Sequence, residues 1–210
     1  MTDSPIQRFQ PNCLTSKVLT ATHTYEEVIK KSLFIGVCTQ VNSPEDFFQF
    51  LAQYQDVNAT HNCWAYRIEN IYRFNDDGEP SGTAGKPILA AIDGAGFDYV
   101  GALVIRHYGG IKLGTGGLAR AYGGTISKNL KSAPHKIHVP LIEASILVSF
   151  QHDQCVYQLL QQHQGQSIKQ QFTTHGTEHH VVLPEELLKS FVKDLKNKTK
   201  GTAKVTVSSI

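Results

Sequence analysis

Carboxylates are missing from the middle of this chain. Residues 99–142 contain not one Asp or Glu, although the 210-residue sequence has 18 acidic residues in all. The same segment carries Arg106, Lys112 and Arg120. Because phosphates are repelled by carboxylates and attracted by cations, an acid-free segment of this kind suits a polyanionic partner.

Cysteines are few, and long apolar runs are absent. The chain has four cysteines, Cys13, Cys38, Cys63 and Cys155. No two of them have the CxxC spacing that is typical of a zinc site. His61 and the pair His179 and His180 also lack the spacing of metal ligands. No window approaches the ~18 apolar residues of a membrane span, and the amino terminus has no apolar signal segment. We therefore expect a cytoplasmic protein with reduced thiols, no metal, no cofactor and no membrane partner.

The net charge of +2 is too small to indicate a nucleic-acid binder by itself, so local features must carry that case. The length suits two small domains. We expect an α+β protein with an amino-terminal α/β domain over residues 1–135 and a carboxy-terminal domain over residues 136–210. A short linker is expected at residues 134–140.

The amino-terminal domain is predicted to mix strands and helices. Ser43 and Pro44 are typical of a helix start, and apolar residues follow at helical spacing: Phe47, Phe50, Leu51 and Tyr54. Residues 24–27 have the spacing of a capping box and predict a turn. The predicted strands of this domain are residues 17–23, 32–41, 62–69 and 99–107. The other predicted helices are residues 87–92, ended by Gly94, and 118–131.

The carboxy-terminal domain is predicted to have the order β-α-β-β-α-β, the split βαβ arrangement of ferredoxin-like domains. The expected strands are residues 141–150, 167–174, 178–183 and 203–208. The expected helices are residues 153–163 and 184–196, the second opening with proline and acids at Pro184, Glu185 and Glu186.

Glycine is concentrated in residues 75–124, which hold all but four of the 17 glycines. A glycine-rich loop at residues 109–117 joins a predicted strand to a predicted helix, so free backbone N–H groups and the helix dipole lie beside cations. This pattern predicts an anion site, although tight helix–strand packing with solvated cations also explains it. The candidate phosphate- or nucleic-acid-binding residues are Lys86, Arg106, His107, Gly109, Gly110, Lys112, Gly114, Gly116, Gly117 and Arg120.

Common catalytic motifs do not fit. Pro87 follows Gly85-Lys86 where a P-loop needs Ser or Thr, and Ser81 stands one place too late for GxSxG. Residues 114–119 fit GxGxxA, but no acid for a ribose follows roughly twenty residues later. The acidic turn at residues 76–79 could hold Mg²⁺ or perform acid–base chemistry, yet such turns are more often only turns. We assign no catalytic residue.

Four motifs resemble the YigZ/IMPACT family: KSLFI at residues 31–35, ATHNCWAYR at 59–67, DDGEPSGTAGKPIL at 76–89 and RHYGGIKLGTGGLARAY at 106–122. The resemblance implies an amino-terminal α/β domain of the kind shared by ribosomal-protein domains and GHMP kinases. It also implies a carboxy-terminal ferredoxin-like domain similar to the last domain of elongation factor G. Tyr108 and Thr115 stand where family members commonly carry Phe and Ala, and neither change threatens an anion-binding loop.

Eukaryotic members of the family look like translational regulators that compete for the activator of a starvation-responsive kinase through an extra amino-terminal domain, which we do not expect here. We therefore expect a non-catalytic, translation-associated regulator that binds RNA or the ribosome through the glycine-rich loop. Exposed tyrosines could stack on a base, the candidates being Tyr66, Tyr72, Tyr108 and Tyr122.

Two alternatives stay open. The first is an enzyme acting on a phosphorylated small molecule, with the glycine-rich loop as its phosphate site. The second is a protein-binding module, whose surface would comprise His61, Arg67, Asp76, Asp77, Glu79 and Ser81. The enzyme requires the acidic turn to face the cationic loop in a closed pocket, whereas an RNA binder should show an open basic face.

Overall fold

A computed structural model of the protein describes residues 7–8 and 15–207. The chain divides into two compact units, Met1–His138 and Val139–Ile210. The division falls after His138 rather than after residue 135, because strand β8 (His135–His138) pairs with strand β2 (Ser16–Leu19) of the first unit. The segment expected as a linker is therefore largely strand.

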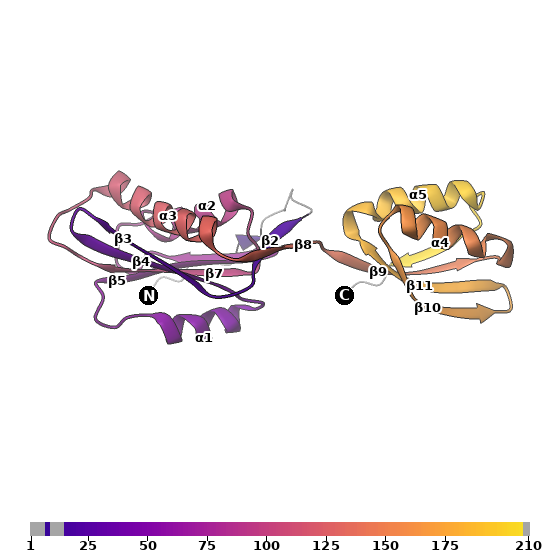
Figure 1. Cartoon of the computed structure of the whole chain (residues 1–210), viewed down its shortest axis with the longest axis horizontal. Helices are drawn as coiled ribbons and strands as arrows, with labels where there is room; N and C mark the ends of the chain where they lie inside the picture. Colours follow the sequence, from indigo (N-terminus) through magenta and orange to yellow (C-terminus); the bar gives the residue numbers. More distant parts are fainter. Residues whose placement is uncertain (1–6, 9–14, 208–210) are drawn as a thin grey trace. The chain divides into compact units, whose positions relative to one another are not determined.

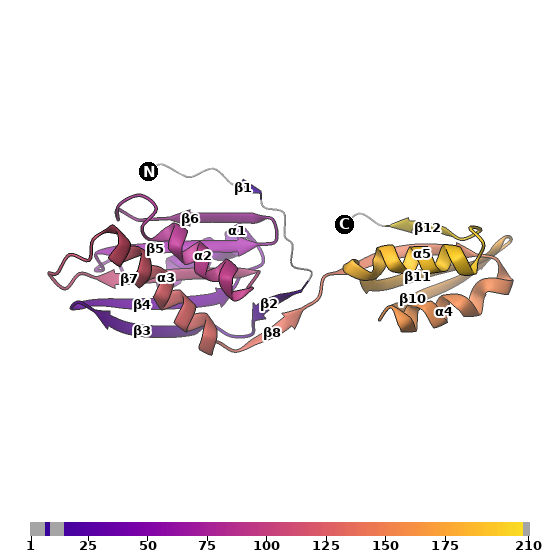
Figure 2. The same ribbon diagram turned by 90° about the horizontal axis from the view of Figure 1, so that it is seen from above.

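The first unit is built on a six-stranded sheet in the order β1-β6-β5-β7-β4-β3, with every neighbouring pair antiparallel (Figure 2). Its strands are β1 (Gln7–Arg8), β3 (His23–Ile29), β4 (Ser32–Gln40), β5 (His61–Ile68), β6 (Ile71–Asn75) and β7 (Val100–His107). Its helices are α1 (Pro44–Tyr54), α2 (Gly85–Ala95) and α3 (Thr115–Ser132).

Helices cover both faces of this sheet, with α2 and α3 on one face and α1 on the other (Figures 1 and 2). The central strand β7 serves both cores, because successive side chains of a strand point to opposite faces. Ala102 and Val104 belong to the core beneath α2 and α3, whereas Leu103 and Ile105 belong to the core beneath α1. By the same alternation, Arg106 lies on the face of α2 and α3.

The prediction of helix α1 is confirmed. The Ser43 side chain accepts a hydrogen bond from the backbone N–H of Asp46 at 3.1 Å, and Pro44 opens the helix. Phe47 and Phe50 are buried in the core beneath the helix, and the other two predicted apolar residues pack against that core partly exposed.

Several local predictions are wrong. Residues 24–27 form no turn but lie within β3, which pairs with β4 along its whole length. Strand β6 was not predicted. Helix α2 ends at Ala95, with Gly96 at a φ of +72° as its C-cap, rather than at Gly94. Helix α3 begins at Thr115, because Gly114 already serves as its N-cap.

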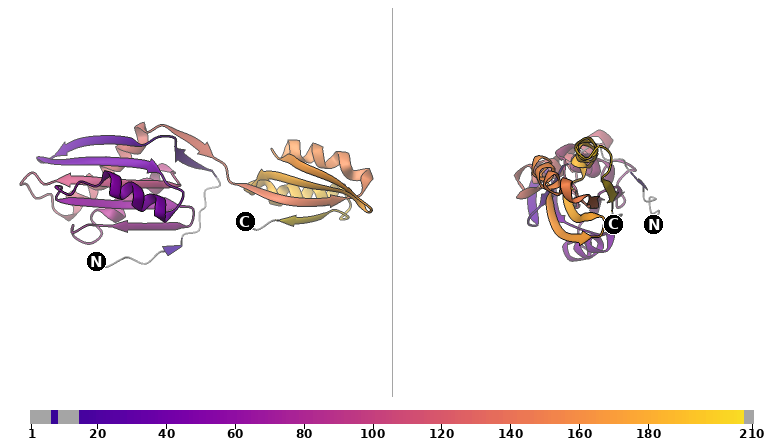
Figure 3. Two further views of the ribbon diagram at one scale, coloured as in Figure 1. Left: turned by 90° about the horizontal axis from the view of Figure 1, so that it is seen from below. Right: turned by 90° about the vertical axis from the view of Figure 1, so that its right-hand side faces the viewer.

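The second unit has the predicted element order β-α-β-β-α-β. It comprises β9 (Leu141–Val148), α4 (Asp153–Gln162), β10 (Gln166–Thr173), β11 (Gly176–Pro184), α5 (Leu188–Lys198) and β12 (Lys204–Val207). The sheet order is β10-β11-β9-β12, and both helices pack on one face of it (Figures 1 and 3). The core between these helices and the sheet includes Val156, Leu160, Val181 and Phe191. No helix among the described residues is both long and apolar enough to cross a membrane.

Candidate functional site

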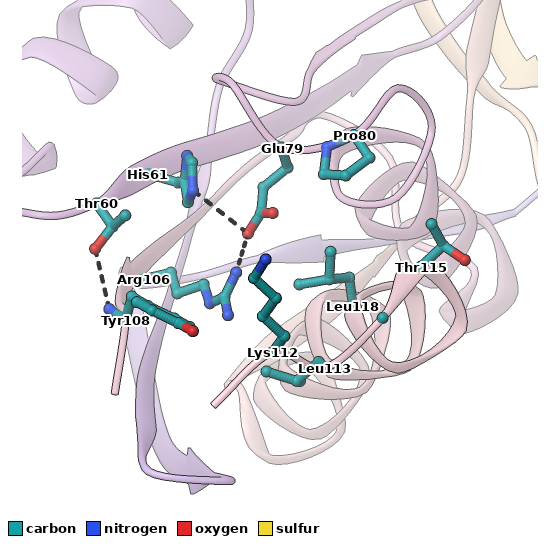
Figure 4. Close-up of a pocket in the computed structure, with 11 residues that line it drawn as sticks. Thr60, His61, Glu79, Pro80, Arg106, Tyr108, Lys112, Leu113, Thr115 and Leu118 are labelled. Atoms are coloured by element: carbon teal, nitrogen blue, oxygen red, sulfur yellow. Dashed lines mark hydrogen bonds and ion pairs between the residues drawn. The ribbon is translucent and has the colours of Figure 1, made fainter. Parts of the chain in front are cut away.

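A cavity of about 450 Å³ lies in the first unit, where β7 ends and β5 begins (Figure 4). The acidic turn, the end of β7, the glycine-rich loop and the start of α3 all contribute to its wall. The lining residues are Thr60, His61, Glu79, Pro80, Arg106, Tyr108, Lys112, Leu113, Gly114, Thr115 and Leu118. The acidic turn and the cationic loop, which lie apart in the sequence, therefore meet in one place.

Arg106 is buried in the wall of this cavity, with only 4% of its surface exposed. Its Nη1 donates a hydrogen bond to the Glu79 carboxylate, and its Nη2 donates one to Ser32 Oγ at 3.4 Å. Its guanidinium also lies 5.3 Å from the ring centre of Phe34 and 5.4 Å from that of Tyr108. Nε of Arg106 is buried and has no hydrogen-bond partner among the described residues.

Glu79 is the acid of the turn that reaches the cavity. Besides Arg106, its Oε1 accepts a hydrogen bond from the Tyr122 hydroxyl at 2.8 Å. The same oxygen lies 3.8 Å from His61 Nε2 (Figure 4). His61 Nδ1 lies 2.7 Å from the Asp77 carbonyl oxygen. Because a carbonyl only accepts, Nδ1 carries the proton of this hydrogen bond, and Nε2 faces Glu79 beside the cavity.

The two aspartates of the turn hold the loop in shape. The Asp76 carboxylate accepts hydrogen bonds from the N–H groups of Gly82, Ala84 and Gly85 at 2.8–2.9 Å, which caps the start of α2 from outside the helix. The Asp77 carboxylate accepts from the Asn62 N–H at 2.5 Å. These contacts explain the acidic turn as a structural element, and they leave Glu79 to face the cations.

Burial raises the pKa of the Tyr122 hydroxyl and of the Cys63 thiol, which lies nearby. The Cys63 thiol donates to the Asp76 carbonyl at 3.0 Å. Both groups therefore remain protonated at neutral pH, and they act as hydrogen-bond donors that hold the turn against the sheet.

The glycine-rich loop packs against the tip of the β3–β4 hairpin. A Cβ at Gly109 would lie 1.9 Å from the Lys31 carbonyl oxygen, so only glycine fits there. Gly114 has a φ of +72° and no side-chain cap. The N–H groups of the next three residues, Thr115, Gly116 and Gly117, have no partner among the described residues, as expected for the first turn of a helix.

Exposed cations surround this helix start. A second cavity of about 240 Å³ lies beside the first, and the two share Leu113. Lys30 and Arg120 line the second cavity, Lys112 lines the first, and Lys31 packs against Gly109 at the hairpin tip. All four cations are exposed, and within residues 15–207 none of them forms an ion pair. We call Lys30, Lys31, Lys112 and Arg120 the cationic rim.

Three predicted cations do not join the rim. Arg106 is buried against Glu79 and is not free for a phosphate on an open surface. His107 points to the opposite face of the sheet, where its Nε2 lies 3.3 Å from the Asp56 carboxylate. Lys86 is exposed at the start of α2 but lines neither cavity. Among the predicted glycines, Gly114 and Gly117 line the cavities, Gly116 lies between them, and Gly110 sits in the exposed loop with a φ of +85°.

Burial decides which tyrosines could stack on a base. Tyr66 and Tyr122 are buried and Tyr72 is half-buried, whereas Tyr108 is 43% exposed at the mouth of the cavity. Tyr108 is therefore the tyrosine of this set that a ligand in the cavity can contact.

The predicted protein-binding surface does not exist as one surface. Arg67 is 7% exposed, and its Nε donates to the Asp93 carboxylate at 2.6 Å. Strand β5, which carries it, is central in the sheet and covered on both faces. Asp76 and Glu79 are engaged as described above, which leaves Asp77 and Ser81 exposed on the turn.

Sequence reasoning missed part of the site. Ser32 and Phe34 contact Arg106, and both belong to the family motifs, which was the available signal. Tyr122 was a candidate to stack on a base, whereas it is buried and donates to Glu79. Lys30 lies outside those motifs and outside the acid-free segment, so nothing in the sequence indicated it. Within residues 15–207, no group of three or more His, Cys, Asp or Glu side chains is arranged to hold a metal ion.

All the residues of this site lie in a region that matches a known family. Residues 30–130 match the model described as the Impact N-terminal domain. An IMPACT family member of Haemophilus influenzae is 36% identical over 186 residues, which cover 84% of this chain and 89% of that protein. The chain belongs to the IMPACT family.

The resemblance predicted from the sequence motifs is thereby confirmed. The IMPACT family member YigZ of Escherichia coli is 36% identical over 156 residues, covering 71% of this chain and 76% of YigZ. A crystal structure described as that of a hypothetical protein is 30% identical with a TM-score of 0.59, covering 94% of this chain and 98% of that one. The mixed α and β architecture is thus shared with a solved structure.

Proposed function

We propose that this IMPACT-family protein is a translation-associated regulator that binds RNA, free or within the ribosome, through the cationic rim. The observation that carries the proposal is that Lys30, Lys112 and Arg120 line two adjoining cavities at the start of α3, whose first N–H groups have no partner among the described residues. Cations gathered beside free backbone N–H groups favour a polyanion.

Backbone donors add to the attraction of the rim. The free N–H groups at the start of α3 and the positive end of the helix dipole bind a phosphate oxygen without further ligands. Tyr108 at the cavity mouth can stack on a base irrespective of sequence. Phosphate contacts of this kind position a nucleic acid, and they give binding that weakens as salt rises.

The second unit supports a role in translation. Its element order and its sheet order β10-β11-β9-β12 favour a ferredoxin-like fold. We propose that it corresponds to the last domain of elongation factor G and positions the protein on a larger partner in the cytoplasm. For the first unit we propose the fold shared by ribosomal-protein domains and GHMP kinases.

The salt dependence of RNA affinity tests this function. Each phosphate-contacting cation that is removed should lower the slope of log K against log salt by about one. We therefore expect Lys112→Ala and Arg120→Ala each to weaken binding of a single-stranded RNA and to flatten that slope.

Lys136→Ala is the matched control. Lys136 is an exposed lysine of the same unit, beyond the far end of α3, which is about 27 Å long. Its removal should leave the slope unchanged. RNA affinity and salt slope that stay the same in Lys112→Ala and Arg120→Ala would show that the rim does not contact RNA.

A second candidate function is an enzyme acting on a phosphorylated small molecule. The observation that favours it is the presence of His61 Nε2 and Glu79 in the same cavity as the α3 start, since an acid–base group must lie beside the phosphate it serves. Thermal unfolding in the presence of phosphorylated metabolites and Mg²⁺ tests it. A substrate at 100 times its Kd stabilises by roughly 2.7 kcal/mol, and no shift with any metabolite speaks against this function.

A further inference from the structure

We infer that the larger cavity is a subsite for a phosphate monoester on a nucleotide, which in the proposed function is the terminal phosphate of an RNA chain. This inference rests on the proposed RNA binding and specifies which part of the RNA the site takes. The structure offers a receptor for one isolated, highly charged phosphate beside a partly apolar chamber, rather than only a track for internal phosphates.

The donors at the α3 start match a monoester in number. Three donors on the wall of the larger cavity have no partner among the described residues: the Thr115 N–H, the Thr115 hydroxyl and the Lys112 ammonium. A monoester presents three terminal oxygens and a charge of about −1.5 to −2. An internal diester has two such oxygens and a single charge, so it would leave part of this donor set unused.

Arg106 gives independent support for a bound ligand. It lines the same cavity, its side chain is only 5% exposed, and Nε has no partner. A buried donor without a partner costs free energy, which indicates that function rather than stability sets the arrangement of this cavity wall. Because Glu79 balances the charge of Arg106, the excess positive charge of the cavity lies at Lys112 and the α3 start.

The rest of the cavity suits the uncharged part of a nucleotide. Pro80, Leu113 and Leu118 give it an apolar wall, and the exposed ring of Tyr108 stands at the same cavity. Ligand sites commonly combine such a wall with a few placed polar groups and have volumes of about 300–1,000 Å³. A phosphate at the α3 start with its base and sugar against this wall fits that pattern.

The smaller cavity explains why an RNA end would bind better than a free nucleotide. Lys30 and Arg120 line it, and Leu113 separates it from the larger cavity. A chain whose terminal phosphate occupies the first cavity can place a following phosphate against these two cations. A free mononucleotide has no second phosphodiester to offer them.

Binding of end-modified RNA to the full chain tests the inference. The probes are one ten-nucleotide RNA with an internal fluorophore, prepared with a 5′-phosphate, with a 3′-phosphate, or with hydroxyls at both ends. We expect one phosphorylated form to bind about tenfold more tightly than the hydroxyl form, as one added charge-assisted contact provides. Lys112→Ala should lose that gain, and Lys136→Ala should keep it.

A nucleoside monophosphate is the second probe, and it separates the two sources of the same chemistry. Arg120→Ala should weaken RNA binding while leaving binding of the mononucleotide unchanged. Equal affinity for all three RNAs would overturn the monoester subsite and leave RNA binding intact. Binding of the mononucleotide without any RNA would keep the subsite and overturn the proposed function, and binding of neither would overturn both.

Discussion

Arg106 is the residue on which the site depends, and its burial determines what it can do. An arginine that is 4% exposed cannot exchange between solvent and a phosphate backbone, so its charge must be balanced inside the protein. Glu79 supplies that balance from the acidic turn, and Ser32 adds a hydroxyl. Arg106 therefore shapes the cavity, whereas in the proposed function the exposed rim cations attract the RNA.

Removing one member of this pair should be costly. We expect Glu79→Ala to lower the free energy of unfolding by about 3–5 kcal/mol, because it leaves the Arg106 charge buried without a counter-charge. Urea unfolding of the full chain measures the change. Lys128→Ala is the control, since Lys128 is 53% exposed and pairs with Glu27 at the surface, where a pair contributes about 0–1 kcal/mol. An equal decrease in the free energy of unfolding in the two variants would show that the buried Arg106–Glu79 pair contributes no more than a surface pair.

Buried thiols should make the protein sensitive to alkali. Burial raises the pKa of Cys38 and Cys63 far above the ordinary value of 9.0. Above pH 9 the unfolded chain loses protons that the folded chain keeps, so stability is full below pH 9 and falls as pH rises beyond it.

Each thiol should contribute a loss of about 1.4 kcal/mol per pH unit. Urea unfolding at pH 8.0, 9.5 and 10.5 measures the slope, and Cys38→Ala should reduce it by one such increment. A stability that does not fall between pH 9.5 and pH 10.5 would contradict the burial of these groups.

The chemistry of individual residues was only partly predictable from the sequence. The acid-free segment drew attention to Lys112 and Arg120, which the structure places exposed at the two cavities, because local composition reports the surface charge of a loop. Composition could not show that Arg106 and His107 differ from Lys112 and Arg120. The exposure of Arg106 and His107 depends on which face of β7 each side chain occupies and on partners elsewhere in the chain. Burial against a distant residue leaves no local signature.

At the scale of elements, the junction of loop and helix depends on a close approach to the β3–β4 hairpin. We expect Gly109→Ala to destabilise the protein by about 1–3 kcal/mol, because the added Cβ would overlap the Lys31 carbonyl. Thermal unfolding and the RNA affinity of the variant measure the effect, and both should fall together.

Gly116→Ala is the matched control for this prediction. It adds a methyl in the first turn of α3, where the nearest atom, on Arg120, is 3.6 Å away. Alanine is the better helix former, so stability should be unchanged or higher by up to about 1 kcal/mol. If Gly109→Ala is as stable as Gly116→Ala, the glycine-rich loop does not pack closely against the β3–β4 hairpin.

Elements were predictable where local chemistry and the tertiary structure agree. Ser43 and Pro44 mark the start of α1 in the sequence and also in the structure, because the capping residue is adjacent to the helix in the chain. Residues 24–27 show the opposite case, since a pattern that favours a helix start is overridden when β3 pairs along β4 at the edge of the sheet. Strand β6 was missed because the polar loop that follows it obscured a short strand.

At the scale of the whole molecule, the first unit gathers its site from segments far apart in the sequence. The hairpin of β3 and β4 supplies Lys30 and Lys31, the acidic turn supplies Glu79, and the loop before α3 supplies Lys112. The family motifs span these segments, but only the sheet order brings them together. The element order of the second unit was predictable because its alternation of strands and helices is regular.

The most direct test of the central claim is a titration of the full chain with a single-stranded RNA, followed by the amide ¹H–¹⁵N chemical shifts. We expect the first and largest saturable shifts at the N–H groups of Thr115, Gly116 and Gly117, with smaller ones at Lys112 and Arg120. The shifts should diminish as salt rises, because phosphate contacts release counterions. Saturable shifts confined to the α1 face or to the second unit, with the α3 start unchanged, would contradict RNA binding at this site.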